Sequence, residues 1–199
     1  DLRGGRRAIG VPTSIGQENS GMKTYLEILN NKDDGAIALD LFDRGFPEGV
    51  YSFKTDGLEV GIGWLFLTTM RLEGTIVCNG FCSIFNQTLA PLEIEDFEKF
   101  FARIGAHDFL EHFQECRRIY FGSGDLPKNN EEWSSFRSEI WLNPEGPESN
   151  RFDLHADKAE KAYYGDDVPG VGYIDMHKKL GAYFREHLKS FMSEADFLK

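Results

Sequence analysis

The chain has 199 residues, 41% of them hydrophobic, and it carries 33 acidic against 22 basic residues for a net charge of −11. This length and composition suit one domain with a substantial core. The negative charge disfavours direct contact with nucleic acid or with an anionic membrane, and it favours basic proteins or cations as partners.

The cysteines and the hydropathy pattern bear on the compartment. Three cysteines form an odd set without a disulfide framework, which predicts a reducing, cytoplasmic environment. No apolar run approaches the ~18 residues that a membrane span requires. Because the first residues are rich in glycine and arginine, we expect residues 1–21 to be a flexible tail added to the natural protein, which then starts at Met22. Residues 22–199 are expected to form a single helical domain.

The first part of this domain is predicted to contain two short helices and one long one. Residues 22–30 and 34–44 have helical character and are separated by a turn-prone Asn-Lys-Asp-Asp-Gly segment. Alternating polarity favours a short strand in a hairpin near residues 46–54. From residue 58 to 76, apolar residues recur every three or four positions, and Trp64 makes the opposite side apolar too. We therefore predict a central helix that is buried nearly all round.

Two glycine breaks divide the middle of the chain. Asn79 and Gly80 end the long helix, and the apolar stretch from Phe81 to Phe85 follows. Gly105 is expected to adopt a left-handed conformation that caps the C-terminus of the next helix, which Pro91 opens. We assign these residues to architecture, as turns that fold the central helix back into a bundle.

Further amphipathic helices are expected in the second half. A helix extends to Gly122, Asn130 is positioned to cap the next, and residues 143–150 have the composition of a loop. Residues 151–164 are predicted to be helical, and Asp175 is predicted to cap a last helix. The fold class is therefore mainly α, a single-domain multi-helix bundle around one central buried helix.

The histidines and cysteines match no known metal or catalytic motif. His107 and His112 are five residues apart, which turns them about 140° from each other on a helix, whereas a zincin helix requires a spacing of four. Cys78 and Cys82 lack the second pair of a zinc site, and Cys116 lies on an apolar stripe. We predict no metal, no cofactor and no catalytic residue, and we expect the cysteines to be small core residues.

Acidic residues gather on two neighbouring predicted helices and are the candidates for contact with a partner. They are Glu93, Glu95, Asp96 and Glu98 on the first helix, and Glu111 and Glu115 on the second. The first group also complements the helix dipole, and Lys99 and Arg103 give that helix a mixed charge. Glu111 and Glu115 are like charges one turn apart, a mildly unfavourable arrangement that a basic partner would offset.

A family resemblance is carried by three segments: Glu73 through Phe85, Ile104-Gly105-Ala106, and Tyr183-Phe184-Arg185-Glu186-His187. In these segments the chain resembles a family of small, acidic, helical bacterial proteins that includes a DNA-mimic protein from a pathogen. Cys78-Asn79 stands where that family usually has Asn-Gly, and Ser83 stands where Gln is common. The resemblance implies an all-helical fold and, for the DNA mimic, a homodimer that binds a transcription factor in place of DNA.

Two functions follow as expectations. The first is a non-enzymatic, acidic, bacterial protein-binding domain, a DNA mimic or regulator whose basic partner is a DNA-binding protein or a toxin. The alternative is an uncharacterised enzyme that uses His107, His112 or His177 beside carboxylates in a cleft. The second function requires those histidines to lie close together, which a structure can test.

Overall fold

The computed structural model of the protein describes residues 22–55, 57–89, 91–122, 126–136, 138–166 and 173–198. All regular secondary structure in these ranges is helical, which confirms the predicted mainly α fold. The expected tail, residues 1–21, lies outside the described residues.

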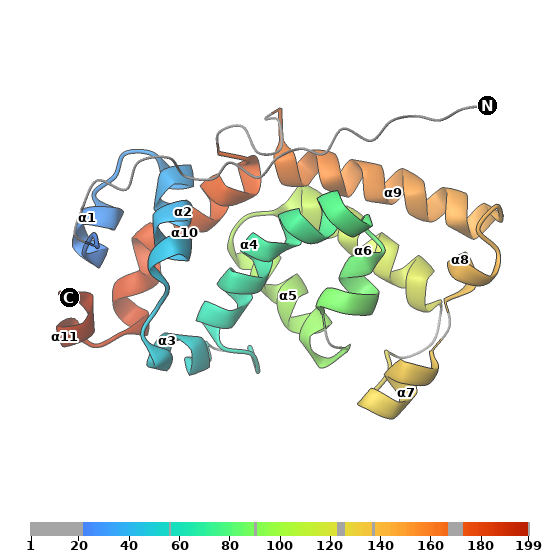
Figure 1. Ribbon diagram of the computed structural model, residues 1–199, viewed down its shortest axis with the longest axis horizontal. Helices are drawn as coiled ribbons and strands as arrows, with labels where there is room; N and C mark the ends of the chain where they lie inside the picture. Colours follow the sequence, from blue (N-terminus) through green and yellow to red (C-terminus); the bar gives the residue numbers. More distant parts are fainter. Residues whose placement is uncertain are drawn as a thin grey trace.

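The helices are arranged as a bundle (Figure 1). In chain order they are α1 (Tyr25–Leu29), α2 (Asp34–Arg44), α3 (Glu48–Ser52), α4 (Ile62–Asn79), the π-helix η1 (Ile84–Thr88), α5 (Pro91–Arg103), α6 (His107–Phe121), α7 (Asn130–Ser135), α8 (Glu139–Leu142), α9 (Pro147–Tyr164), α10 (Asp175–Phe191) and α11 (Glu194–Phe197). None of these helices has the length and apolar character needed to cross a membrane.

Two helix pairs flank the central helix α4. Helix α10 packs against α2, and α6 packs against α9, with α4 between these pairs in Figure 1. The first pair approaches closely because Gly181 of α10 has no side chain. A Cβ at that position would lie 1.7 Å from the carbonyl oxygen of Asp34 at the start of α2.

The central helix α4 is buried on most sides. Leu65, Phe66 and Leu72 are almost fully excluded from solvent and belong to the main hydrophobic core. Trp64, however, is 40% exposed, and Arg71 and Gly74 on the same face of the helix are exposed as well. The helix therefore has one open side, contrary to the prediction that it is buried nearly all round.

The predicted hairpin near residues 46–54 is wrong, because that segment forms the short helix α3. The chain then reverses, and the backbone N–H of Ile62 donates to the carbonyl oxygen of Phe53 at 2.9 Å. Gly61 permits this close approach, since a Cβ there would lie 1.8 Å from the carbonyl oxygen of Tyr51. Helix α3 packs against α4, and the described part of the chain contains no strand that could form a hairpin.

Both glycine breaks occur at the predicted positions, and Gly105 has the positive φ expected of a C-terminal cap. Gly80 follows α4 with φ +78°, and Gly105 follows α5 with φ +72°. The N–H of Gly105 donates to Ala102 at 3.2 Å, while the N–H of Ala106 donates to Phe101 at 2.9 Å. These two bonds form a Schellman motif, which satisfies the last carbonyl groups of α5 and turns the chain into α6.

The apolar stretch after Gly80 enters the core and leads into η1. Phe81 and Phe85 are buried, and the Phe85 ring lies 5.1 Å from that of Phe113 on α6, measured between centroids. Leu89 donates its N–H to the carbonyl oxygen of Ile84 at 3.0 Å, which is the five-residue spacing of a π-helix. This segment joins the central helix to the aromatic core beneath α6.

Three boundaries in the second half differ from the prediction. Asn129 rather than Asn130 caps α7, because its side-chain oxygen accepts two backbone N–H groups of that helix. Helix α9 begins at Pro147, inside the predicted loop 143–150, since proline suits the first helical turn. Asp175 is the first residue of α10 and does not cap it.

Candidate functional site

Asp96, one of the six predicted partner-binding carboxylates, is internal. It is 2% exposed, and its Oδ2 accepts hydrogen bonds from the backbone N–H groups of Glu59 and Val60 at 2.6 Å each. Lys99 lies 3.2 Å from its other oxygen. Asp96 therefore fastens the segment before α4 to α5 and is not available to a partner.

The other acidic residues of α5 face different neighbours. Glu93 accepts a hydrogen bond from the indole N–H of Trp64 at 3.2 Å. Glu98 forms an ion pair with Arg117 of α6 at 3.2 Å, and burial raises its pKa. Glu95 is exposed. The four carboxylates of this helix thus do not form one continuous acidic surface.

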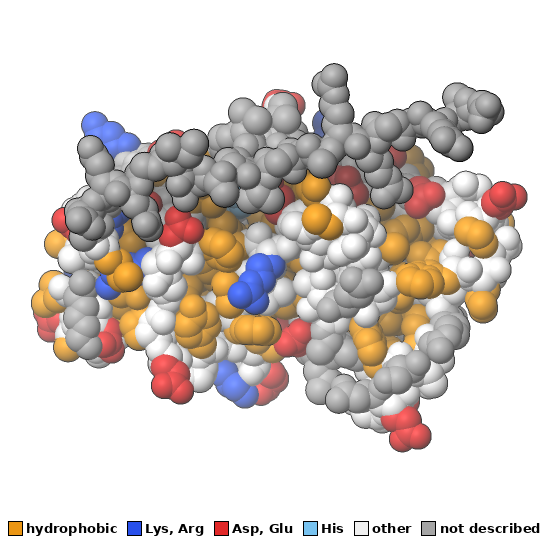
Figure 2. All heavy atoms as spheres, in the orientation of Figure 1, with side chains coloured by type: hydrophobic (Ala, Val, Ile, Leu, Met, Phe, Trp, Pro, Cys, Tyr) orange, Lys and Arg blue, Asp and Glu red, His pale blue; other side chains and the backbone are white. Residues whose placement is uncertain are grey.

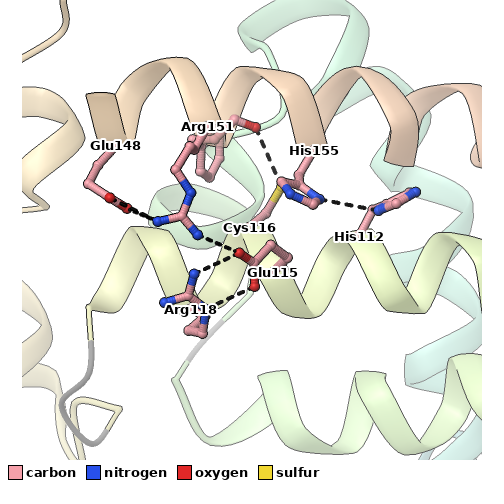
Figure 3. A network of polar contacts seen from close by, with 8 residues as sticks. His112, Glu115, Cys116, Arg118, Glu148, Arg151 and His155 are labelled. Atoms are coloured by element: carbon pink, nitrogen blue, oxygen red, sulfur yellow. Dashed lines mark hydrogen bonds and ion pairs between the residues drawn. The ribbon is translucent and has the colours of Figure 1, made fainter. Parts of the chain in front are cut away.

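Glu115 lies at the centre of an ion-pair network between α6 and α9 (Figure 3). Its carboxylate accepts from Arg118 at 2.6 and 2.8 Å and from Arg151 at 2.9 Å, and Arg151 also contacts Glu148 at 2.9 Å. The hydrogen bonds from Arg118 are the main cause that lowers the pKa of Glu115 to about 2. Two arginines balance two glutamates, so this network is locally neutral. Glu111 on the same helix is exposed and forms no ion pair with any described residue.

The three histidines that were candidates for an enzyme active site have different surroundings. His112 meets His155 of α9, with 3.3 Å between the two Nδ1 atoms, as Figure 3 shows. His177 is 4% exposed, its Nε2 is 3.7 Å from Glu73, and burial lowers its pKa to about 4. His107 is exposed at the start of α6. These partners do not place the three rings in a common cleft.

The cysteines have three different environments. Cys116 is buried, as predicted for a core residue, and burial raises the pKa of its thiol. Cys82 is half-buried, whereas Cys78 is exposed, contrary to the prediction. Within the described ranges, no three His, Cys, Asp or Glu side chains are grouped closely enough to hold a metal ion.

An open groove of about 620 Å³ lies beside α9 and collects acidic and apolar side chains. Asp153, Asp157 and Glu160 line it from α9, while Trp141 and Ile140 line it from α8. We call this feature the acidic groove. Trp141 is 56% exposed, so a flat aromatic face is open to solvent beside the carboxylates.

The charge of the acidic groove is not balanced locally. Asp153, Asp157 and Glu160 follow an i, i+4, i+7 spacing that places them on one face of α9. They form no ion pair with described residues, and no Lys or Arg is among the described residues that line the groove. Burial raises the pKa of Glu160, and the neighbouring charge of Asp157 adds to this effect. Lys161 of the same helix lines a separate hollow.

None of these three carboxylates belongs to the six predicted from the sequence. Their spacing within the predicted helix at residues 151–164 is a signal that could have indicated a common face. The opposing Trp141 could not be found this way, because only the tertiary fold places α8 beside α9.

Comparison with known proteins gives no assignment: no family model, no curated protein and no solved structure matches this chain.

Proposed function

We propose that this protein is a non-enzymatic binding protein whose acidic groove holds a Lys- or Arg-rich segment of a basic protein partner. The observation that carries the proposal is the set of three unpaired carboxylates, Asp153, Asp157 and Glu160, beside the exposed ring of Trp141. A DNA-binding protein and a toxin are both partners of suitable charge.

The chemistry of the groove fits a cationic side chain. Each carboxylate attracts a guanidinium or ammonium group, and an arginine also stacks on an indole ring through a cation–π interaction. The net charge of −11 adds a long-range attraction that guides a basic segment toward the protein. Binding of this kind weakens with salt, since the Debye length is about 8 Å at physiological ionic strength.

A short basic segment fits better than an extended DNA-binding surface. A DNA mimic presents a long array of carboxylates in place of phosphates. Of the six carboxylates predicted from the sequence, Asp96 is buried, and Glu98 and Glu115 are paired with arginines. Among the described residues, Asp153, Asp157 and Glu160 are unpaired carboxylates that do lie together, in the acidic groove.

A defined peptide tests the proposal directly. The probe is an acetylated and amidated octapeptide of alternating Arg and Gly, titrated by isothermal calorimetry at low salt. The groove variant combines Asp153→Asn, Asp157→Asn and Glu160→Gln. The control variant combines Asp43→Asn, Glu95→Gln and Glu111→Gln, which change the net charge equally at exposed sites outside the groove.

We expect the groove variant to bind the peptide at least about tenfold more weakly, because it loses three partly exposed ion pairs, each of modest strength. The control variant is expected to lose less than about threefold, through the long-range term alone. Equal losses of affinity in both variants would show that only the net charge matters. A groove variant that binds the peptide as tightly as wild type would rule the site out.

A further inference from the structure

A second cavity, of about 310 Å³, lies where η1, α6, α7 and α8 meet. Its walls are aromatic: Phe85 from η1, Tyr120 from α6, Trp133 from α7, Phe136, and Trp141 from α8. Figure 2 shows hydrophobic side chains gathered on this part of the surface. The volume falls in the lower range of small-molecule sites, which begins at about 300 Å³.

One polar side chain in this cavity lacks a partner. The Oδ1 atom of Asn86 is buried and accepts no hydrogen bond from the described residues. The other small polar group, the Ser138 hydroxyl, already donates to the carbonyl oxygen of Tyr120 at 2.7 Å. A buried acceptor without a donor carries a desolvation penalty that a bound N–H group would remove.

The backbone that holds Asn86 is also unusual. It lies in the π-helix η1, and short π-helical segments occur frequently at functional sites. Ring contacts fix the neighbouring wall, since Phe85 lies 5.4 Å from Tyr120 between centroids. The backbone at Asn86 is therefore held by a well-packed element, and a turn of the side-chain amide is enough to bring its buried Oδ1 to the cavity that the residue lines.

The cavity favours an uncharged ligand. No Asp, Glu, Lys, Arg or His is among the described residues that line it. Burial raises the pKa of Tyr120 to about 12, so its phenol stays neutral. Flat aromatic walls bind flat rings by offset stacking and edge-to-face contact.

We propose that this cavity binds an uncharged, planar heteroaromatic small molecule, and that the Asn86 amide turns its Oδ1 toward the cavity to accept a hydrogen bond from an N–H group of the ligand. The site is separate from the acidic groove, although Trp141 lines both. Asn86 does not line the groove, so a variant at this position tests the cavity without altering the groove.

Indole and 1-methylindole are the probes, because they share a shape and differ in the N–H donor. We expect indole to bind the full chain at one saturable site with a Kd below about 1 mM, a reasonable affinity for so small a ligand. We expect 1-methylindole to bind about three- to tenfold more weakly, as the loss of one hydrogen bond predicts. Isothermal calorimetry and ligand-observed NMR measure both.

Three variants separate the hydrogen bond from the shape of the cavity. Asn86→Leu is expected to abolish the preference for indole over 1-methylindole, since it removes the acceptor at similar volume. Trp141→Ala is expected to weaken both probes, whereas Trp64→Ala, at another exposed tryptophan, leaves them unchanged.

The proposal is overturned if indole shows no saturable binding, or if wild type and Asn86→Leu show the same preference for indole. Equal effects of Trp141→Ala and Trp64→Ala also overturn it. If Asn86→Leu does not fold, the proposal is still tested by the affinities of indole and 1-methylindole for wild type, Trp141→Ala and Trp64→Ala.

Discussion

Arg151 of α9 contacts Glu115 of α6, with 2.9 Å between a guanidinium nitrogen and a carboxylate oxygen. The pair ties together two helices that also pack through buried apolar side chains. Because of this ion pair, Glu115 is not a free acidic residue. The unpaired carboxylates of α9 lie on a different face of that helix, in the acidic groove.

Glu115→Gln is expected to lower the free energy of unfolding at pH 7 by about 0.5–1.5 kcal/mol, because it weakens partly exposed ion pairs with two arginines. The pKa of Glu115 falls from 4.5 to about 2 in the folded protein. Its stabilising effect is therefore complete above pH 4.5 and is lost as the pH falls toward 2. Urea denaturation across this range measures the difference, with Glu111→Gln as control. A difference that stays constant down to pH 2 would contradict the assigned role.

Asp96→Ala is expected to lower the free energy of unfolding by about 2–4 kcal/mol, because it leaves two backbone N–H groups without their charged acceptor. Those groups belong to Glu59 and Val60, in the segment just before the central helix. The matched variant Glu95→Ala, at an exposed position of the same helix, is expected to change stability by no more than about 0.5 kcal/mol. Similar losses in both variants would show that Asp96 has no special structural role.

His177→Leu is expected to change how stability depends on pH. The pKa of His177 falls from 6.5 to about 4 in the fold because burial disfavours the charged ring. The free energy of unfolding is therefore not reduced by His177 above pH 6.5. It falls by about 2–3 kcal/mol as the pH falls to 4, because the unfolded chain binds a proton that the buried ring does not. We expect His177→Leu to lack this pH-dependent loss of stability, and His107→Gln, at an exposed position, to show it as wild type does. Identical pH profiles for His177→Leu and wild type would refute the assignment.

Gly181→Ala is expected to destabilise the protein by about 2–4 kcal/mol, since its Cβ would overlap the Asp34 carbonyl and force α10 away from α2. Gly74→Ala is the opposite case, because that helical glycine has open space around it. We expect it to stabilise the protein by about 0.5–1 kcal/mol through helix propensity. Thermal and urea denaturation check both signs, and a neutral Gly181→Ala would contradict the close helix contact.

Much of the fold could be predicted because the relevant signals are local. Helix α2 has the predicted bounds, and the Gly105 cap and the Pro91 start occur where the sequence places them. Each of these depends on backbone preferences of one residue and its near neighbours. Helix α3 was not predictable in this way, since a short alternating segment fits a strand as well as a single helical turn.

The candidate site could be predicted only in part because it depends on tertiary contacts. The sequence indicates acidic residues but not which of them meet an arginine from another helix, as Glu115 meets Arg151. Nor does it show that Asp96 faces a backbone segment 36 and 37 residues earlier. The groove itself requires α8 beside α9, which no local pattern specifies.

Mapping the Arg-Gly octapeptide by amide chemical shifts tests the central claim most directly. On the labelled full chain, we predict that the largest shifts occur in α8 and in the part of α9 that carries Asp153, Asp157 and Glu160, and that salt reduces them. Shifts centred instead on α5 and α6, around Glu95 and Glu111, or spread evenly over the surface, would contradict it.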